Sequence, residues 1–134
     1  MGAWGPGVFE NDDASDWVWE LEDDNDMSVL HEALAAVVDT PLDELIEAPD
    51  ASNALAAAEI VAAARGHHGA DLPSEAREWI GRNAGIVDAR TVALAAAAVE
   101  RVSIDSELKE LWEEAESDEW PLVVSGLLER LRAR

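Results

Sequence analysis

Six residues near the start of the chain have side chains that could bind a ligand. Two aromatic rings and four oxygen-bearing side chains lie close together there: Trp4, Phe9, Asn11, Asp12, Asp13 and Asp16. Carboxylate and amide oxygens are ligands for hard cations such as Ca²⁺ and Mg²⁺, and aromatic rings could frame a pocket for a small molecule. An EF-hand calcium loop needs glycine at its sixth position, however, and the frames that begin at Asp12 and Asp13 have Trp17 and Val18 there. The segment is therefore a candidate binding site without a specific metal motif.

The same segment also has a structural explanation. Three glycines and Pro6 favour a turn-rich conformation over residues 1–10, because glycine permits backbone torsions that other residues avoid and proline fixes φ. Asn11 is a suitable helix N-cap, and the acidic residues after it are favourable in a first helical turn, where the helix dipole is positive. We expect residues 1–10 to form a strap that packs Trp4 and Phe9 on the core and leads into the first helix.

Glu59 is the only polar residue between Ala54 and Ala64. A buried carboxylate has to be paired or protonated, because an isolated buried charge costs several kcal/mol. The sequence predicts a structural ion pair and offers three arginines as partners: Arg77, Arg90 and Arg101. The alternative is a carboxyl group of shifted pKa that lines a cavity near the strap. No second acid, base or nucleophile is indicated beside Glu59, and one carboxylate is too little for a catalytic mechanism, so no catalytic residue is assigned. A protein that binds a small ligand or a metal cation in a pocket near the strap and Glu59, with or without enzymatic activity, is the alternative function.

The sequence favours neither a metal site nor a cofactor. The chain has no cysteine and three histidines. His31 and Glu32 begin like the zinc-binding pattern H-E-x-x-H, but Ala35 stands where the second histidine is needed. His67 and His68 are neighbours on a predicted loop, where adjacent side chains point in different directions. A zinc site built from the three histidines is thus disfavoured.

Charge is the most unusual property of the chain, because its net charge of −21 is unevenly distributed. Residues 1–64 contain sixteen acidic residues and no lysine or arginine, whereas residues 65–134 contain fourteen acidic and nine basic residues. Such a charge repels nucleic acids and anionic membranes and attracts basic protein surfaces. We therefore expect a basic protein as partner, bound in the manner of an immunity protein or a nucleic-acid mimic. The other interpretation is that the acidity only serves solubility in a salt-adapted cell, in which case folding would improve markedly toward molar salt.

Nothing in the sequence indicates a membrane segment or an export signal. No apolar run approaches about 18 residues, the length that suggests a membrane span, and the N-terminus has no basic region like that of a secretory signal. A cytoplasmic location is expected on this basis. The sequence does not indicate an oligomeric state.

The composition predicts an all-α fold in a single domain that spans residues 1–134. Alanine and leucine are prominent among the apolar residues, and both favour helices over strands. We expect six or seven helices around a central pair of alanine-rich helices. The pair covers 51–65 and 88–102, other helices begin after Asn11 and cover 28–38, 41–48 and 120–132, and shorter segments carry Trp79 and Trp112.

Several helix ends carry residues that are typical of caps. Thr40 and Pro41 resemble an N-cap followed by proline in the first turn, and Pro49 is expected to end the short helix that they start. Further N-caps are predicted at Ser74, at Asp88, and at Asp105 or Ser106. Gly66 is expected to end the helix over 51–65.

The two alanine-rich segments resemble each other, with ALAAAEIVAA in the first and ALAAAAVERV in the second. A duplicated helical hairpin would explain the likeness. Low-complexity alanine composition is the simpler explanation, and the sequence alone leaves both open. In either case the small side chains allow the two helices to approach closely.

Three segments carry a resemblance to a known family: the opening MGAWGPGVFENDDASDW, the helix AAAEIVAAARG and the segment VERVSIDSELKELWEEAESDEW. In this order, and with the patterns M-G-x-W-G-x-G-x-F-x-N-D and S-E-L-x-E-L-W, they resemble the bacterial family catalogued as domain of unknown function 4259. The resemblance covers essentially the whole chain. It implies a small, self-contained helical protein and no particular activity. This chain starts with more acidic residues than the family pattern often shows, so its charge is harder to interpret as a shared functional property.

Overall fold

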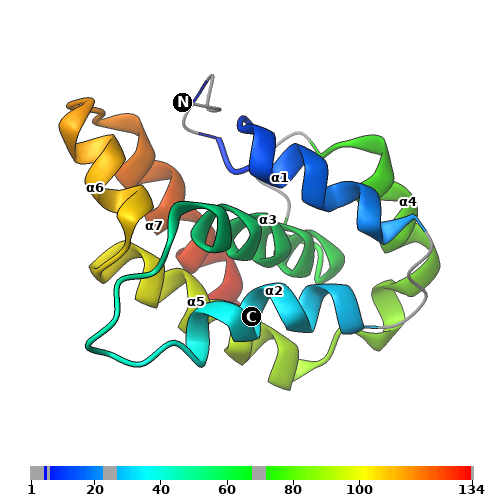
Figure 1. Cartoon of the computed structure of the whole chain (residues 1–134). Helices are drawn as coiled ribbons and strands as arrows, with labels where there is room; N and C mark the ends of the chain where they lie inside the picture. The colour runs from blue at the N-terminus through cyan, green and yellow to red at the C-terminus, as the bar shows by residue number, and fades with distance from the viewer. Residues whose placement is uncertain (1–4, 6, 23–26, 68–71, 134) are drawn as a thin grey trace.

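Helix α3 (Ala48–Ala64) forms the axis of the fold, and the other helices pack around it (Figure 1). The computed structural model describes residues 5, 7–22, 27–67 and 72–133. This part of the chain is helical and contains no β-strand, and none of its helices has the length and apolarity needed to cross a lipid bilayer. Its elements follow the order α1 (Asp12–Trp17), the 3₁₀ turn η1 (Val18–Leu21), α2 (Ser28–Val38), α3, α4 (Ser74–Asn83), the 3₁₀ turn η2 (Ala84–Ile86), α5 (Ala89–Ile104), α6 (Glu107–Glu114) and α7 (Glu119–Arg132).

Alanine makes α3 the most enclosed of these helices. Twelve of its seventeen residues are buried, because small side chains let α2 and α5 pack close to its backbone. Helix α5 packs against α2, α3 and α7 through one face only: Ala95, Ala98 and Val102 are buried, whereas Ala93 and Ala97 are exposed. The predicted alanine-rich pair is therefore present, with α3 in the centre and α5 as one of the walls around it.

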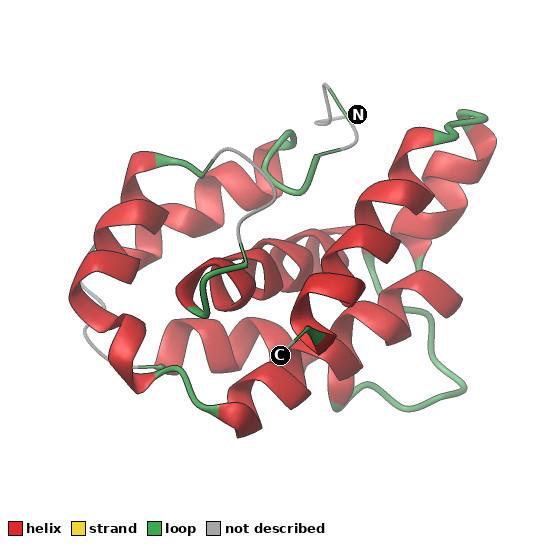
Figure 2. Ribbon diagram, turned by 180° about the vertical axis from the view of Figure 1, so that it is seen from behind, coloured by secondary structure: helices red, strands yellow, loops and turns green. Residues whose placement is uncertain are grey.

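The last two helices enclose the remaining side of α3. Helices α6 and α7 follow each other with only a short turn between them, and α7 contacts both α3 and α5. Seen from behind, α7 brings the C-terminal end of the chain back to the middle of the fold (Figure 2). The C-terminal half of the chain thus lies against the same central helix as the acidic N-terminal half.

Local capping signals place several helix ends where the sequence predicts them. Three N-cap side chains each accept a hydrogen bond from the backbone N–H three positions later: Asn11 from Ala14 (2.8 Å), Asp88 from Thr91 (3.0 Å) and Ser106 from Lys109 (3.0 Å). Gly66 has a φ of 89°, which glycine adopts without strain. Helix α3 ends there in a Schellman motif, in which the N–H of His67 donates to Ala62 O at 2.9 Å.

Two other capping predictions are wrong. The predicted helix over 41–48 does not form: residues 41–47 adopt turns and extended backbone, and α3 begins at Ala48. The hydroxyl of Thr40 donates to Ala36 O at 2.6 Å, so it closes α2 instead of capping a new helix. Helix α4 begins with Ser74 as its first helical residue, so the N-cap position falls on Pro73, which makes no side-chain cap hydrogen bond.

Long-range hydrogen bonds hold this extended segment against the start of α6. Ile46 forms an isolated parallel bridge with Ser106, in which the N–H of Glu107 donates to Ile46 O at 2.8 Å. The Glu107 carboxylate in turn accepts the N–H of Ala48 at 2.9 Å, at the start of α3. Pro49 lies in the first turn of α3, where its missing N–H leaves no helical bond unmade.

The described part of the predicted strap reaches the core through two side chains. Val8 is buried, and the partly buried Phe9 packs against the same core. Trp4 lies outside the described residues. The strap over residues 1–10 as a whole therefore stays a prediction.

The cap of α5 predicts a specific pH dependence of stability. Hydrogen bonds from the backbone N–H and hydroxyl of Thr91 hold the pKa of Asp88 below its ordinary value of 3.8. Ionised Asp88 thus stabilises the fold above that pH, and the stabilisation is lost as the pH falls through the lowered pKa. In urea unfolding, Asp88→Asn is expected to be less stable than the wild type near pH 6, and the difference is expected to be smaller near pH 2 (both values approximate).

Asp118 supplies the matched control for this prediction. It occupies the N-cap position of α7 but makes no side-chain cap hydrogen bond. Asp118→Asn should therefore show little pH-dependent difference from the wild type. An equal loss of stability in Asp88→Asn at both pH values would contradict the account of its ionisation.

Candidate functional site

A groove between α1, α2 and the first turns of α3 gathers carboxylates from three separate segments. Its volume is about 180 Å³, and its lining residues are Trp17, Glu20, Val29, Glu32, Ala33, Ala36, Asp50 and Asn53. Three of these residues are acidic and none is basic. We call this site the acidic groove.

Helical periodicity gives the acidic groove an apolar floor and a charged rim. Trp17 is only 6% exposed, whereas Glu20, three positions later, is exposed. On α2, Ala33 is buried and its neighbour Glu32 is exposed. Residues three or four positions apart lie on the same side of a helix, so one helical surface supplies both apolar and charged lining atoms. A ligand in the groove would meet both kinds of surface.

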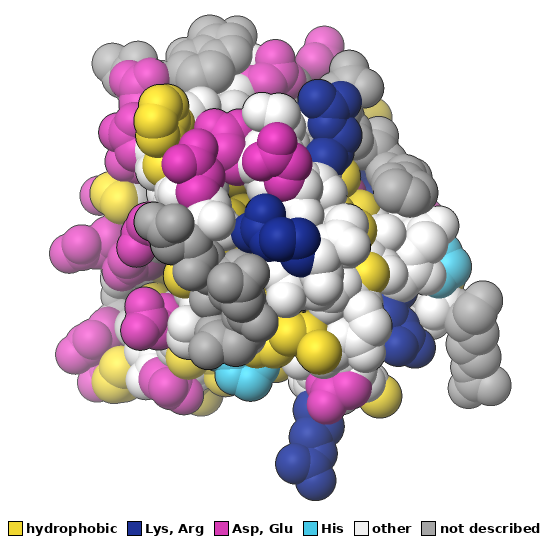
Figure 3. Space-filling view, turned by 90° about the vertical axis from the view of Figure 1, so that its right-hand side faces the viewer, with side chains coloured by type: hydrophobic (Ala, Val, Ile, Leu, Met, Phe, Trp, Pro, Cys, Tyr) yellow, Lys and Arg dark blue, Asp and Glu magenta, His cyan; other side chains and the backbone are white. Residues whose placement is uncertain are grey.

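The carboxylates of the acidic groove have no ion-pair partner within the described chain. Among the acidic residues described in the first 64 positions, only Glu59 takes part in an ion pair. Arg82 and Arg101 contact the first 64 residues by donating hydrogen bonds to backbone carbonyls. Arg82 donates to Leu21 O at 3.0 Å, and Arg101 donates to Glu44 O at 2.9 Å. In the view of Figure 3, acidic side chains gather toward one side of the surface, and Lys and Arg side chains lie singly. The negative charge of the groove is therefore uncompensated by ion pairs.

Asn53 adds a neutral hydrogen-bond acceptor to the acidic groove. Its Oδ1 atom is buried and has no hydrogen-bond partner among the described residues. Asn53 follows Asp50 by three positions on α3, so the two face the same side. Carboxylates and amide oxygens accept hydrogen bonds, whereas the ammonium group of lysine and the guanidinium of arginine only donate them. The groove thus matches a cationic donor, and a buried acceptor without a partner costs free energy until a donor reaches it.

A metal ion matches the acidic groove less well than an organic cation does. Within the described residues, no three side chains of His, Asp or Glu lie close enough together to hold a metal ion. Of the predicted histidine pair, His67 is described and His68 lies outside the described residues. An ammonium or guanidinium group on a long side chain can bind carboxylates that are spread around a groove.

Of the N-terminal residues singled out in the sequence, those that the structure describes do not line the acidic groove. The side chain of Asn11 caps α1, and Asp12 and Asp13 are exposed in its first turn. Asp16 is also exposed, near the end of α1. Their predicted role in ligand binding stays a prediction.

Sequence reasoning missed the acidic residues that do line the groove. Glu20, Glu32 and Asp50 come from three segments, and only the packing of α1, α2 and α3 brings them together. The signal that was available is the absence of any lysine or arginine before Arg65. This absence indicates that the carboxylates of residues 1–64 have no basic residue near them in the sequence. It does not indicate which of these carboxylates come together in the fold.

The cavity beneath the strap is small. Its volume is about 20 Å³, and its lining includes Gly7, Asn11 and Trp120 but neither Phe9 nor Glu59. A cavity needs roughly 10–15 Å³ to hold one water molecule. The space enclosed by the described residues is therefore of the size of a water molecule, not of a metabolite.

Glu59 forms the predicted structural ion pair, but with a partner that the sequence did not indicate. Its side chain is 1% exposed, and both of its oxygens accept hydrogen bonds from Arg130 on α7, Nη1 to Oε2 at 2.5 Å and Nη2 to Oε1 at 2.9 Å. The bonds to Glu59 raise the pKa of Arg130 above its ordinary value. The predicted partners Arg77, Arg90 and Arg101 are therefore wrong. Glu59 and Arg130 are 71 positions apart in the sequence, and only the packing of α7 against α3 brings them together.

Comparison with known proteins identifies the family. The chain belongs to the family described as Domain of unknown function (DUF4259), which matches residues 2–121. No curated protein and no solved structure matches the chain.

Proposed function

We propose that this family member is a non-catalytic interaction module that binds a basic protein through the acidic groove. One observation carries the proposal: Glu20, Glu32 and Asp50 converge around an apolar floor with no basic residue in the lining. The three carboxylates are exposed, and like charges that lie close together repel one another, so the site lowers its free energy when a cation enters.

A lysine or arginine side chain fits the chemistry of the acidic groove. Its charged end donates hydrogen bonds to the rim carboxylates. Its aliphatic stem packs on Trp17 and Ala33 of the floor. Arginine adds a planar guanidinium that stacks on an indole ring.

The charge of the whole chain supports fast and salt-sensitive association. A net charge of −21 attracts a basic partner over a distance that is set by the ionic strength. Steering of this kind raises the association rate constant more than it lowers the dissociation rate constant. We propose that the module acts as an immunity protein or a nucleic-acid mimic does, by covering a basic site of its partner.

A tetra-arginine peptide tests whether the acidic groove is the binding site. In a titration of ¹⁵N-labelled protein at low salt, the largest amide shifts are expected at Trp17, Ala33 and Asn53. Addition of about 0.5 M salt should reverse the shifts, because a Debye length of about 4 Å screens the attraction. Weak shifts spread over all acidic surfaces, with none concentrated at the groove, would contradict the proposal.

A small-ligand or metal site near the strap and Glu59 is the second candidate, and the geometry favours it less. Both oxygens of Glu59 are already bound by Arg130. The cavity under the described part of the strap has a volume of about 20 Å³. A ligand there would have to displace the ion pair or open the core.

A further inference from the structure

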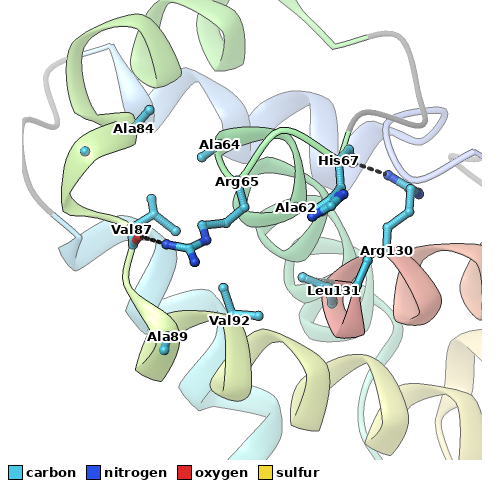
Figure 4. Close-up of a pocket in the computed structure, with 12 residues that line it drawn as sticks. Ala62, Ala64, Arg65, His67, Ala84, Val87, Ala89, Val92, Arg130 and Leu131 are labelled. Atoms are coloured by element: carbon cyan, nitrogen blue, oxygen red, sulfur yellow. Dashed lines mark hydrogen bonds between the residues drawn. The ribbon is translucent and has the colours of Figure 1, made fainter.

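The C-terminal end of α3 opens into a further pocket, far along the helix from the acidic groove. Its volume is about 470 Å³, and its walls come from the end of α3, from η2, from the start of α5 and from the end of α7 (Figure 4). Small residues line much of it, among them Ala62, Ala84, Gly85 and Ala89. A Cβ atom added at Gly85 would meet nothing within 4 Å. The pocket is therefore open because the side chains around it are short.

The charge of this pocket is opposite to that of the chain. Among the residues that the structure describes, its lining includes Arg65, His67 and Arg130 and no Asp or Glu. The charge of Arg130 is matched by Glu59, and Arg130 also donates to His67 O at 3.2 Å. Arg65 takes part in no ion pair within the described residues. We call this site the basic pocket.

Arg65 is held in position by the backbone and keeps donors for a ligand. Its Nη1 donates to Val87 O at 3.1 Å, which fixes the guanidinium beside the η2–α5 connection (Figure 4). A guanidinium has five N–H groups, and this is the only side-chain hydrogen bond of Arg65 among the described residues. The remaining donors form the planar arrangement that binds a carboxylate or phosphate through two parallel hydrogen bonds.

Two features near the basic pocket carry negative charge or partial charge: the carboxylate of Asp88 and the C-terminal end of α3. At the end of α3, Ala62 O and Ala63 O accept the N–H groups of His67 and Gly66. Asp88 lies next to the lining residues, but its carboxylate accepts bonds from the N–H and hydroxyl of Thr91 at the start of α5. Neither group competes directly for the free donors of Arg65.

We propose that the basic pocket binds a small organic anion, with its carboxylate or phosphate on Arg65 and its apolar part against Val87, Val92 and Leu131. These three side chains provide an apolar wall in the same pocket. The net charge of −21 repels anions from the rest of the surface, so an anion is retained only where specific donors outweigh that repulsion. The site is separate from the acidic groove, and its test does not depend on a basic partner.

Phenyl phosphate and benzoate are the probes, and benzyl alcohol is the uncharged control. Each is titrated into ¹⁵N-labelled protein up to about 20 mM, well into the range of weak binding. Saturable shifts of the amides of Gly66, Gly85 and Ala89 are expected with at least one of the two anions and not with benzyl alcohol. A response to only one anion identifies the anionic group that the pocket accepts.

Three variants distinguish anion binding at the basic pocket from a general attraction of anions to any exposed arginine. Arg65→Ala is expected to weaken anion binding about tenfold, because it removes charged hydrogen bonds. Ala89→Phe fills the pocket from an exposed position on α5 and should also weaken binding. Arg132→Ala removes an exposed arginine that pairs with Glu100 outside the pocket, so binding should stay within about twofold.

The proposal is overturned by any of three results. These are no saturable shift with either anion, equal shifts with benzyl alcohol, or an affinity that Arg65→Ala leaves unchanged. Far-ultraviolet circular dichroism of each variant shows whether it is folded. If Arg65→Ala does not fold, the Ala89→Phe variant gives the decisive comparison.

Discussion

Replacing Arg130 with methionine is expected to destabilise the protein by about 3–5 kcal/mol, because it leaves a buried carboxylate without its counter-ion. Glu59 is 1% exposed and sits on the most enclosed helix of the fold. The free energy of unfolding, measured by urea denaturation at neutral pH, gives the effect directly.

The two partners of this ion pair should respond unequally to removal. The Arg130 side chain is 24% exposed, so in Glu59→Leu the guanidinium can turn toward solvent and the loss of stability should be smaller. The double variant Glu59→Leu/Arg130→Met should recover much of the stability that Arg130→Met loses, since it leaves no unpaired buried charge. Arg132→Met is the matched control, because its exposed pair with Glu100 contributes less than about 1 kcal/mol.

Equal losses in the two single variants, with additive losses in the double variant, would contradict this account. That result would mean that each side chain stabilises the fold through its own packing. Coupling between the two substitutions is the measure of the ion pair itself.

Reversing two charges of the acidic groove is expected to weaken binding of a tetra-arginine peptide roughly 30-fold, as two lost ion pairs of about 1 kcal/mol each would do. The variant is Glu20→Lys/Glu32→Lys, and both residues are exposed at the rim of the groove. Because their side chains face solvent, the substitutions should leave the fold intact. Isothermal titration calorimetry at low salt measures the dissociation constant.

A control with the same change in net charge separates the groove from the total charge. Glu110 and Glu114 are exposed on α6 and line none of the pockets described above. Glu110→Lys/Glu114→Lys should change the dissociation constant by less than about threefold, since it alters only long-range attraction. If both double variants weaken binding equally, the peptide responds to net charge and the acidic groove is not the site.

Local sequence signals predicted helix ends well where nothing distant competes with them. Asn11, Asp88 and Ser106 cap helices because each side chain needs only an N–H three positions away. Thr40 carries the same type of signal, but its hydroxyl bonds back to α2, and the bridge between Ile46 and Ser106 keeps the following segment extended. Bonds between residues far apart in the sequence decide that case, and no local pattern contains them.

The candidate sites were harder to predict than the fold. The run of apolar residues around Glu59 predicted that it would be buried and paired, but Arg130 comes from a helix 71 positions away. The acidic groove depends on Glu20 and Asp50, which lie on different helices and have no motif in common. Asn53 precedes the apolar run of α3, and only the packing shows that its Oδ1 atom is buried. The distribution of charge along the sequence indicated which half of the chain contains the acidic groove, but not which residues line it.

Co-purification of tagged protein from its native host at low salt tests the central claim most directly. Three proteins are compared: the wild type, Glu20→Lys/Glu32→Lys and Glu110→Lys/Glu114→Lys. The account predicts a stoichiometric basic protein with the wild type and with the α6 variant, released at about 0.5 M salt and absent from the groove variant. No basic partner with the wild type, or the same partner with all three proteins, would contradict it.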